Sequence, residues 1–295
     1  MYRIAFDIGG TFTDFVLAGD DAEPRFLKLP TTPADPAVAV ADGLGRLLEE
    51  AAIAGDALDA VLHATTIATN AIIERKGAPT ALITTEGFRD VLIIGRQKRY
   101  ETYDLYMEKP APLVPRRAIF EVAQRMDHRG AVLAPLDQTT VARAADAIRA
   151  GGYASVAVAL LHGYANPTDE QAIREMLAER LPGVPVTLAA ELSPKFREYE
   201  RTSTAVANAY VRPIVANYVE RLEATLAELG CRRSMFIMQS AGGLISPEIA
   251  RTEPVRIVES GPAAGVLMAA MIGKEAGAEH VITFDMGGTT AKLGA

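Results

Sequence analysis

Two stretches near opposite ends of the chain repeat one pattern, an aspartate followed by Gly-Gly-Thr. The first is Asp7-Ile-Gly-Gly-Thr-Phe-Thr-Asp14, and the second is Asp285-Met-Gly-Gly-Thr-Thr-Ala-Lys292. Each follows an apolar run, which is typical of a strand that carries a carboxylate into a tight turn. Paired glycines let backbone N–H groups approach an anion, and threonine hydroxyls add donors. The pattern therefore predicts two phosphate-binding loops.

One copy alone could be an ordinary hairpin turn, because Gly-Gly is a common turn dipeptide. Two copies after the same kind of strand favour a duplicated fold, in which two related lobes each contribute one loop to a clamp on ATP. The candidate residues are Asp7, Gly9, Gly10, Thr11, Thr13 and Asp14 in the first loop, and Asp285, Gly287, Gly288, Thr289 and Thr290 in the second. The four threonines are the predicted phosphate donors.

A second polar block, His63-Ala-Thr-Thr-Ile-Ala-Thr-Asn70, opens a predicted helix directly after a strand. Its polar residues Thr65, Thr66, Thr69 and Asn70 exceed what the capping of one helix requires. His63 lies inside the strand, which favours a buried, hydrogen-bonded histidine over a catalytic base.

Composition excludes several classes of protein. The net charge is −7, and no block of Lys or Arg has the density of a nucleic-acid footprint. The densest basic stretch, Arg96-Gln-Lys-Arg99, is interpreted as a solvated loop, although arginine also suits a carboxylate or a phosphate. With Cys231 as the single cysteine, neither a disulfide framework nor a Cys-rich metal site can form, which indicates a reducing compartment.

Neither a secretory leader pattern nor an apolar run of about 18 residues is present, so we expect a cytoplasmic protein that does not enter a membrane. The sequence also lacks a G-x-S-x-G elbow and a Cys–His pair typical of a hydrolase nucleophile. The chemistry should therefore come from ATP.

Apolar periodicity predicts a hairpin over residues 1–18, a strand at 25–29, a helix at 36–54, a strand at 61–64, a helix at 67–76 and a strand at 80–84. This order is that of a ribonuclease-H-like lobe. Residues 88–135 have poor periodicity and clustered prolines, which predicts an irregular insertion.

Helix and strand patterns then alternate at 137–150, 154–161, 167–181 and 185–189, as in a parallel sheet covered by helices. A long helix is predicted over 200–229, kinked or divided at Pro213, and a strand at 234–239. A helix over 262–277 is rich in Ala and Gly, which permits close backbone packing.

The double D-x-G-G-T pattern resembles the phosphate-1 and phosphate-2 loops of the actin, Hsp70 and sugar-kinase superfamily. Within it, the chain is similar to the hydantoinase A, 5-oxoprolinase and acetone carboxylase β-subunit family. The resemblance rests on both loops and on the blocks 63–70, Glu74-Arg-Lys-Gly77, Gly87-Phe-Arg-Asp90, Ile94-Gly-Arg-Gln97, Glu198-Tyr-Glu-Arg-Thr-Ser203, Gln239-Ser-Ala-Gly-Gly243 and Ser260-Gly-Pro-Ala-Ala-Gly265.

The resemblance implies an α/β fold with a ribonuclease-H-like, actin-like ATPase lobe. It divides the chain into an N-terminal lobe, residues 1–180, and the beginning of the hydantoinase A domain, residues 181–295, with the helix 262–277 as a hinge between lobes. The alternative role of that helix is tight core packing. Family members continue past the second loop, so we expect a fragment, and the missing lobe either lies on another polypeptide or is cut from this sequence.

The resemblance also implies the chemistry. Asp7 and Asp285 would approach a hydrated Mg²⁺ that bridges the β- and γ-phosphates of ATP, and Asp14 would contact a water on Mg²⁺ or orient its loop. Thr65, Thr66, Thr69, Asn70 and Arg96 would serve the substrate. ATP would phosphorylate the carbonyl oxygen of a cyclic amide such as a hydantoin or 5-oxoproline, which water then opens. The expected partner is a hydantoinase B-like subunit, in an oligomer.

Two alternatives stay open: a ketone carboxylase subunit of the same family, and a non-catalytic actin- or Hsp70-like ATP switch. The blocks at 63–70 and 94–97 favour an enzyme, because a switch does not need them. A sugar kinase is disfavoured because no acidic sugar-binding cluster is evident, and an iron–sulfur activator ATPase is disfavoured because one cysteine cannot hold a cluster. The sequence does not identify the amide or ketone.

Overall fold

The computed structural model describes residues 1–32, 35–98, 101–286 and 291–294. The chain forms two compact units, which are presented separately: unit 1 is Met1–Glu74 with Ile214–Ala295, and unit 2 is Arg75–Pro213. Both ends of the chain lie in unit 1, so the compact units differ in kind from the predicted sequence domains, whose division after residue 180 stays a prediction. No helix within the described ranges is long and apolar enough to cross a membrane.

Unit 1 is built on a six-stranded sheet with the order β12-β11-β4-β1-β2-β3. Its elements are β1 (Tyr2–Ile8), β2 (Phe12–Gly19), β3 (Ala22–Pro30), α1 (Pro36–Ala51), η1 (Gly55–Ala57), β4 (Leu58–Thr65), α2 (Ile67–Ile73), the C-terminal part of α7 (Glu198–Glu228), β11 (Met235–Met238), β12 (Leu244–Ile245), α8 (Pro247–Thr252), η3 (Pro254–Ile257), α9 (Ser260–Glu275), β13 (Thr283–Met286) and β14 (Ala291–Gly294). The first three strands are antiparallel, whereas β4 runs parallel to both β1 and β11.

One prediction about this sheet is wrong. The strand predicted at 80–84 forms as β5 (Thr80–Thr85), but it belongs to unit 2 and not to the first sheet. The strand that follows β4 in space is β11, which comes after the whole of unit 2 in the sequence. Strand pairing between such distant segments depends on tertiary contacts that local periodicity does not encode.

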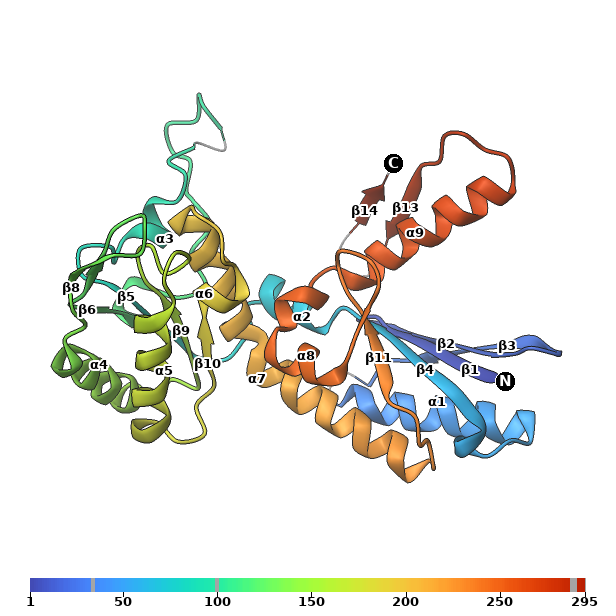
Figure 1. Ribbon diagram of the computed structural model, residues 1–295. Coiled ribbons are helices and arrows are strands. Elements are labelled where there is room, and N and C mark those ends of the chain that lie inside the picture. The colour runs from blue at the N-terminus through green and yellow to red at the C-terminus, as the bar shows by residue number, and fades with distance from the viewer. Residues whose placement is uncertain (33–34, 99–100, 287–290, 295) are drawn as a thin grey trace. The chain divides into compact units, whose positions relative to one another are not determined.

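The core of unit 1 lies between the sheet and two helices, α1 and the C-terminal part of α7, which Figure 1 shows along one side of the strands. Asp35 caps α1 by accepting a hydrogen bond from the Ala37 N–H at 3.1 Å. Gly43 of α1 packs against the Phe15 ring of β2, where a Cβ would lie only 2.4 Å from a ring carbon. A glycine is therefore required for this close approach of helix and sheet.

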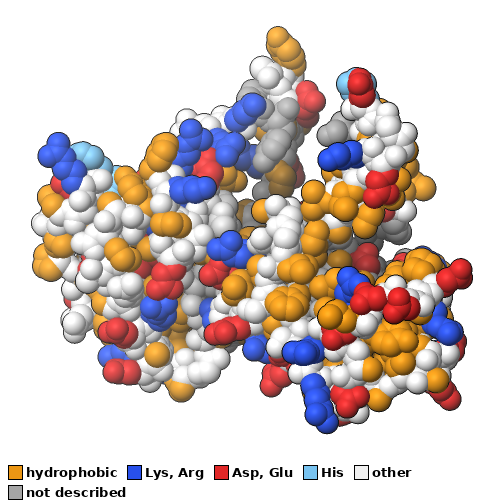
Figure 2. Space-filling view, turned by 45° about the vertical axis from the view of Figure 1, so that its right-hand side comes forward, with side chains coloured by type: hydrophobic (Ala, Val, Ile, Leu, Met, Phe, Trp, Pro, Cys, Tyr) orange, Lys and Arg blue, Asp and Glu red, His pale blue; other side chains and the backbone are white. Residues whose placement is uncertain are grey.

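Helix α9 confirms the predicted helix near 262–277, but most of its length is not packed in a core. Only Ser260 and Gly273 are buried along it, whereas Leu267, Met268, Met271 and Ile272 are exposed. Figure 2 shows hydrophobic side chains gathered on this segment. The alternative of tight core packing therefore does not describe α9 in this structure, and the hinge stays a prediction.

Unit 2 is a parallel sheet with the order β10-β9-β5-β6, covered by helices. Its further elements are α3 (Val91–Ile94), η2 (Arg116–Ala118), β6 (Ile119–Val122), β7 (Arg125–Met126), β8 (Val132–Ala134), α4 (Gln138–Ala150), β9 (Ser155–Ala159), α5 (Thr168–Arg180), β10 (Val186–Leu188), α6 (Ala189–Leu192) and the N-terminal part of α7. The alternation predicted for residues 137–189 is confirmed. The region 88–135 is less irregular than predicted, because β6 in it is a strand of the sheet.

Adjacent residues of β5 point into two different cores. Ile83 packs with Ile148 of α4 and Leu177 of α5, whereas Leu82 packs with Val206 of α7. The alternation of side chains along a strand places these neighbours on opposite faces of the sheet. Both faces of β5 are therefore covered, as expected for a central parallel strand.

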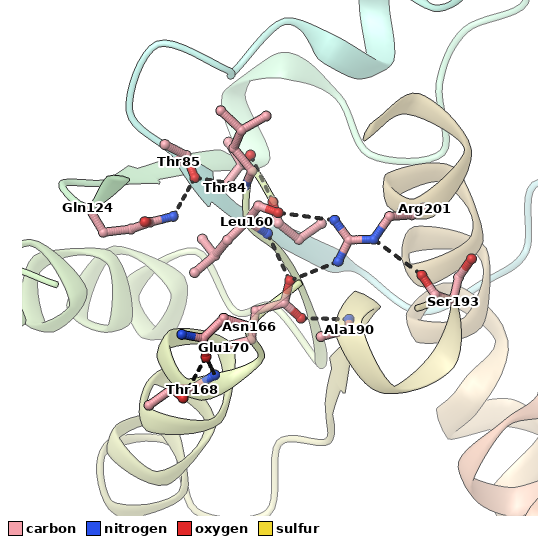
Figure 3. A network of polar contacts seen from close by, with 12 residues as sticks. Thr84, Thr85, Gln124, Leu160, Asn166, Thr168, Glu170, Ala190, Ser193 and Arg201 are labelled. Carbon is pink, nitrogen blue, oxygen red and sulfur yellow. Dashed lines mark hydrogen bonds and ion pairs between the residues drawn. The ribbon is translucent and has the colours of Figure 1, made fainter. Parts of the chain in front are cut away.

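Helix α7 is one continuous helix, so the predicted division at Pro213 does not occur. Its first turns are fixed in unit 2 by a buried ion pair between Arg201 and Glu170 of α5, 3.3 Å apart (Figure 3). Arg201 also donates to the carbonyl oxygens of Leu160 and Ser193, and Glu170 accepts from the backbone N–H groups of Leu160 and Ala190. These bonds compensate for the burial of two charges.

Candidate functional site

The first predicted phosphate loop is the turn between β1 and β2. The Gly9 N–H donates to the Phe12 carbonyl at 3.0 Å and closes the turn, and a Cβ at Gly9 would approach that carbonyl oxygen to 3.1 Å. Gly10 and Thr11, at the tip, are exposed. The tip therefore presents backbone and hydroxyl donors to solvent, as a phosphate-binding turn requires.

Thr13 differs from the other candidates in this loop because its side chain is fully buried. Its hydroxyl lies 3.0 Å from that of Thr31, which itself donates to the Gly9 carbonyl at 2.9 Å. The Thr31 N–H also donates to the Thr11 carbonyl at 2.9 Å. Thr13 and Thr31 thus brace the turn from inside, and a direct contact between Thr13 and a phosphate does not fit this geometry. Thr31 was not predicted as a site residue.

A row of charged side chains crosses the sheet beside the turn. Asp7 of β1 pairs in register with Asp14 of β2, and Asp14 with Lys28 of β3, whose Nζ lies 2.7 Å from the Asp14 carboxylate. Two carboxylates directly opposite each other repel. Lys28 therefore stabilises Asp14 and holds its side chain, which favours the loop-orienting role that the sequence left open.

The pKa of Asp7 is raised above its usual range. Burial is the largest cause, followed by repulsion from the carboxylates of Asp14 and Asp285, while Lys28 acts in the opposite direction. A cation beside Asp7 would relieve the repulsion.

The second repeat also forms a hairpin, between β13 and β14. Asp285 pairs in register with Lys292, at the position where the first hairpin has Asp14. The predicted ligands Gly287, Gly288, Thr289 and Thr290 lie outside the described residues. The described parts of the two hairpins thus have the same antiparallel pairing, but the second has the cation Lys292 where the first has the carboxylate of Asp14.

The block after β4 lies against the first loop. Thr66 donates to the Ile8 carbonyl through its N–H at 3.2 Å and its hydroxyl at 3.3 Å, and the Asn70 amide donates to the Thr66 hydroxyl at 3.1 Å. The same amide nitrogen lies 3.7 Å from where a Cβ would stand on Gly10. Asn70 is therefore a neighbour of the predicted phosphate turn.

Thr65 and Thr69 of this block are buried, and they form hydrogen bonds to the segment that begins α9. The Thr69 hydroxyl accepts from the Glu259 N–H at 2.9 Å, and the Thr65 carbonyl accepts from the Ser260 hydroxyl at 3.1 Å. Both bonds hold the beginning of α9. A direct substrate contact by these two threonines does not fit their burial.

The beginning of α9 faces Asp7. A Cβ on Gly261 would lie 3.7 Å from Oδ1 of Asp7, so the helix backbone comes close to the carboxylate. Glu259, just before the helix, has the left-handed φ of 68°, an uncommon conformation for a residue with a side chain. Its carboxylate forms an ion pair with Lys292 of β14. The sequence reasoning did not identify Glu259 as a site residue.

A cavity of about 450 Å³ lies between α9 and the second hairpin. Its polar lining includes Ser240, Glu259, Asp285 and Lys292. Asp285, one candidate residue of the second repeat, thus borders an open space beside the start of α9.

His63 is enclosed in the core of unit 1. Its Nδ1 lies 3.3 Å from the Phe6 carbonyl and its Nε2 lies 2.7 Å from the Tyr218 hydroxyl. Burial lowers the pKa of His63 from 6.5 to about 3. The interpretation as a buried, hydrogen-bonded histidine agrees with these contacts.

Arg96 belongs to unit 2, whereas the other candidate residues belong to unit 1. Its Nε donates to the Glu200 carboxylate at 2.6 Å. Within the described ranges, no three His, Cys, Asp or Glu side chains are grouped so as to hold a metal ion directly.

Comparison with solved structures supports the fold. A nucleotide-free structure from a study titled "Mechanism of ATP-Dependent Acetone Carboxylation" matches all of this chain and 44% of its own, with a TM-score of 0.90 and 26% identity. The crystal structure of ATP-dependent caprolactamase from Pseudomonas jessenii matches 99% of this chain and 43% of its own, with a TM-score of 0.88 and 34% identity. These matches confirm the predicted α/β fold with an actin-like ATPase lobe.

Sequence relatives span almost the whole chain. They include an uncharacterized protein of Methanocaldococcus jannaschii (42% identical, 99% of this chain, 43% of the relative), the caprolactamase alpha subunit of P. jessenii (36%, 98% and 42%) and the acetophenone carboxylase gamma subunit of Aromatoleum aromaticum (33%, 97% and 41%). The chain thus spans less than half the length of these relatives.

Two sequence families match the chain. The hydantoinase/oxoprolinase N-terminal region matches residues 3–181, and the hydantoinase/oxoprolinase family matches residues 201–295. Together they cover both phosphate-loop repeats and the polar block after β4, which confirms the resemblance inferred from the motifs. The chain belongs to the hydantoinase/oxoprolinase family.

Proposed function

We propose that this chain carries the phosphate-binding part of an ATP-dependent enzyme that opens cyclic amides such as hydantoins or 5-oxoproline. The observation that carries the proposal is the position of Asp7, beside an exposed Gly-Gly-Thr turn, close to Gly261 of α9 and within electrostatic reach of Asp285. Family membership and a relative named as a caprolactamase subunit support this substrate class.

The exposed turn would bind the phosphates of ATP through Gly10 and Thr11. Asn70, braced on Thr66, lies beside the turn, where its amide can donate to a phosphate oxygen or to the substrate. Because the second loop repeats the sequence pattern of the first, the second set of phosphate donors would come from Gly287, Gly288, Thr289 and Thr290. Thr13 acts by bracing the first turn.

Asp7 and Asp285 would hold Mg²⁺ through its waters, and the metal would neutralise charge on the β- and γ-phosphates. The residues fit this group because Asp7 is held near two further carboxylates at a cost in repulsion. Lys28 keeps Asp14 turned along the sheet. The carboxylates of the chain thus position the phosphates without forming a covalent bond.

In the proposed reaction, the amide carbonyl oxygen attacks the γ-phosphorus, and the bond from that phosphorus to the bridging oxygen breaks to release ADP. Water then adds to the activated carbon, and the C–N bond breaks as the nitrogen takes up a proton and leaves as the amine, which gives an acyl phosphate. A second water hydrolyses the acyl phosphate to a carboxylate and inorganic phosphate. Phosphoryl transfer asks the protein mainly for positioning and charge stabilisation. Glycine, threonine and aspartate suffice for that task.

A ketone carboxylase is the second candidate, favoured by the match to an acetophenone carboxylase subunit. Activation of a carbonyl oxygen by ATP would serve both substrates, so the described residues do not separate them. ATP hydrolysis stimulated by hydantoin, 5-oxoproline or caprolactam supports the amide reaction, whereas stimulation that needs a ketone together with bicarbonate supports the carboxylase.

The proposed partner is a hydantoinase B-like subunit, because relatives are named as subunits of larger enzymes. The assay should therefore use the full protein with that subunit. An ATP turnover that responds to neither amides nor ketones, with or without the subunit, would leave the actin- or Hsp70-like switch as the better description.

The decisive variant is Asp7→Asn, which keeps the shape of the side chain and removes its charge. We expect a loss of at least about 100-fold in Mg²⁺-dependent ATP turnover, since metal positioning contributes a few kcal/mol to the transition state. Asp20→Asn is the matched control, because Asp20 lies at the far end of the same β1–β2 pair and bonds to Arg3. A folded Asp7→Asn protein with nearly normal turnover would remove Asp7 from the site.

A further inference from the structure

Unit 2 contains a pocket of its own, of about 700 Å³, between the end of α3, the returning chain at residues 109–112 and the start of α7. This volume lies within the range of small-molecule sites. The pocket is lined by Arg96, Lys98 and Lys109, and no Asp or Glu is among the described lining residues. It is therefore a groove open to solvent, with an excess of positive charge among its described lining residues.

The three cationic side chains differ in their hydrogen-bond and ion-pair partners. Arg96 is paired through Nε with Glu200, whereas Lys98 forms no ion pair with any residue that the structure describes. Lys109 donates from Nζ to the Ile94 carbonyl at 3.0 Å, which fixes its position without neutralising it. Neither lysine is thus paired with a carboxylate of the residues that the structure describes, so both are accessible to an anionic ligand.

The walls of the pocket are apolar. Ile93 and Ile94 of α3 are exposed there, and the Tyr199 ring and Pro110 complete the lining. Exposed isoleucine side chains gain free energy when an apolar group covers them. The lining thus fits a compact apolar body that carries a negative charge.

The backbone that presents Arg96 is held in an uncommon conformation. Gly95 and Gln97, on either side of it, have left-handed φ values of 59° and 56°, and Gly95 packs against the Tyr199 ring. Conformations of this kind persist where the surroundings enforce them, often at binding sites.

The opposite wall is equally fixed. Tyr199 and Glu200 directly precede Arg201, whose buried pair with Glu170 anchors the first turns of α7 (Figure 3). Glu200 in turn orients Arg96. The start of α7 is therefore a preformed wall of the pocket, which reduces the entropy lost on binding.

We propose that this pocket binds the carboxylate of a small ligand with a compact apolar body, with Lys98 and Lys109 contacting the carboxylate. In one respect this inference rests on the proposed function. Among the cyclic amides proposed there as substrates, the pocket would favour those that carry a carboxylate, such as 5-oxoproline. Binding itself requires neither ATP nor the phosphate loops.

The test is calorimetric titration of the full protein, without nucleotide, using matched pairs of probes: 5-oxoproline against 2-pyrrolidone, and benzoate against benzyl alcohol. We expect each carboxylate to bind at least about 10-fold more tightly than its neutral analogue, because a hydrogen bond to a charged group is stronger than one between neutral groups. The difference should shrink as salt increases.

Lys98→Ala and Lys109→Gln should each weaken carboxylate binding about 10-fold and leave the neutral analogues unaffected. Lys195→Ala is the control, since Lys195 is exposed in the same unit and does not line the pocket. Asp7→Asn should bind the carboxylates normally, which separates this inference from the proposed function. Equal affinity for charged and neutral probes, no binding of either carboxylate, or displacement of both carboxylates by equimolar inorganic phosphate would overturn the proposal.

Discussion

The enclosed His63 should make the stability of the protein depend on pH in a defined window. The Phe6 carbonyl can only accept a hydrogen bond, so Nδ1 must carry the proton, and the unprotonated Nε2 accepts from the Tyr218 hydroxyl. This neutral tautomer satisfies both partners. A second proton would place a charge in a core where the imidazole is only 2% exposed.

The sign and size follow from the pKa, which burial lowers from 6.5 to about 3. Below pH 6.5 the unfolded chain takes up a proton at this histidine and the folded chain does not, so the free energy of unfolding falls as pH falls. Between pH 7 and pH 5 the loss from His63 is about 2 kcal/mol, and it continues until the pH approaches 3.

Urea unfolding at pH 7 and pH 5 measures this loss, with His63→Gln as the comparison because a neutral amide cannot take up the proton. We expect the wild type to lose about 2 kcal/mol more than the variant over this interval. Carboxylates that titrate in the same range are common to both proteins and cancel in the difference. Equal losses in the two proteins would refute the neutral, buried assignment.

Two further substitutions test packing and charge in unit 2, and Gly45→Ala in α1 of unit 1 is the control for the first of them. Gly77→Ala should destabilise the protein by about 1–3 kcal/mol, because the new Cβ would lie 2.0 Å from the Tyr210 ring, whereas Gly45→Ala, with open space around it, should be neutral or stabilising in thermal unfolding. Glu170→Gln should cost about 3–5 kcal/mol in urea unfolding by leaving Arg201 buried without its charge partner, and a loss below 1 kcal/mol would contradict the assigned role of the pair.

The sequence predicted those parts of the site that are local in the chain. The first Gly-Gly turn and the strands that carry Asp7 and Asp285 follow from short-range patterns. The burial of Thr13 could also have been predicted, because Thr13 alternates with Asp14 and shares a face with Phe15, which is buried. The phosphate-donor assignment ignored that alternation.

Contacts between distant segments could not be predicted in the same way. The bond from the Glu259 N–H to Thr69 joins residues 190 positions apart, and the approach of Gly261 to Asp7 spans a still larger separation. Nothing in the local sequence indicates that Glu259 adopts a left-handed φ. The pocket beside Arg96 could not be predicted either. One of its walls is formed by Tyr199 at the start of α7, which is distant in the sequence from the basic stretch that contains Arg96.

The position of β11 in the first sheet imposes an order on biosynthesis. Residues 75–213 are contiguous and can fold as soon as they leave the ribosome, whereas the edge of β4 that receives Met235–Met238 must wait for a segment made much later. Until then β4 has an unpaired edge, which can pair with other nascent chains. Once unit 2 has folded, residues 75–213 no longer form a long flexible loop between β4 and β11. Less conformational entropy is then lost when these two strands pair, so faster folding of unit 2 speeds their pairing. A substitution that slows the folding of unit 2 should therefore reduce the yield of native protein even where the final stability is unchanged.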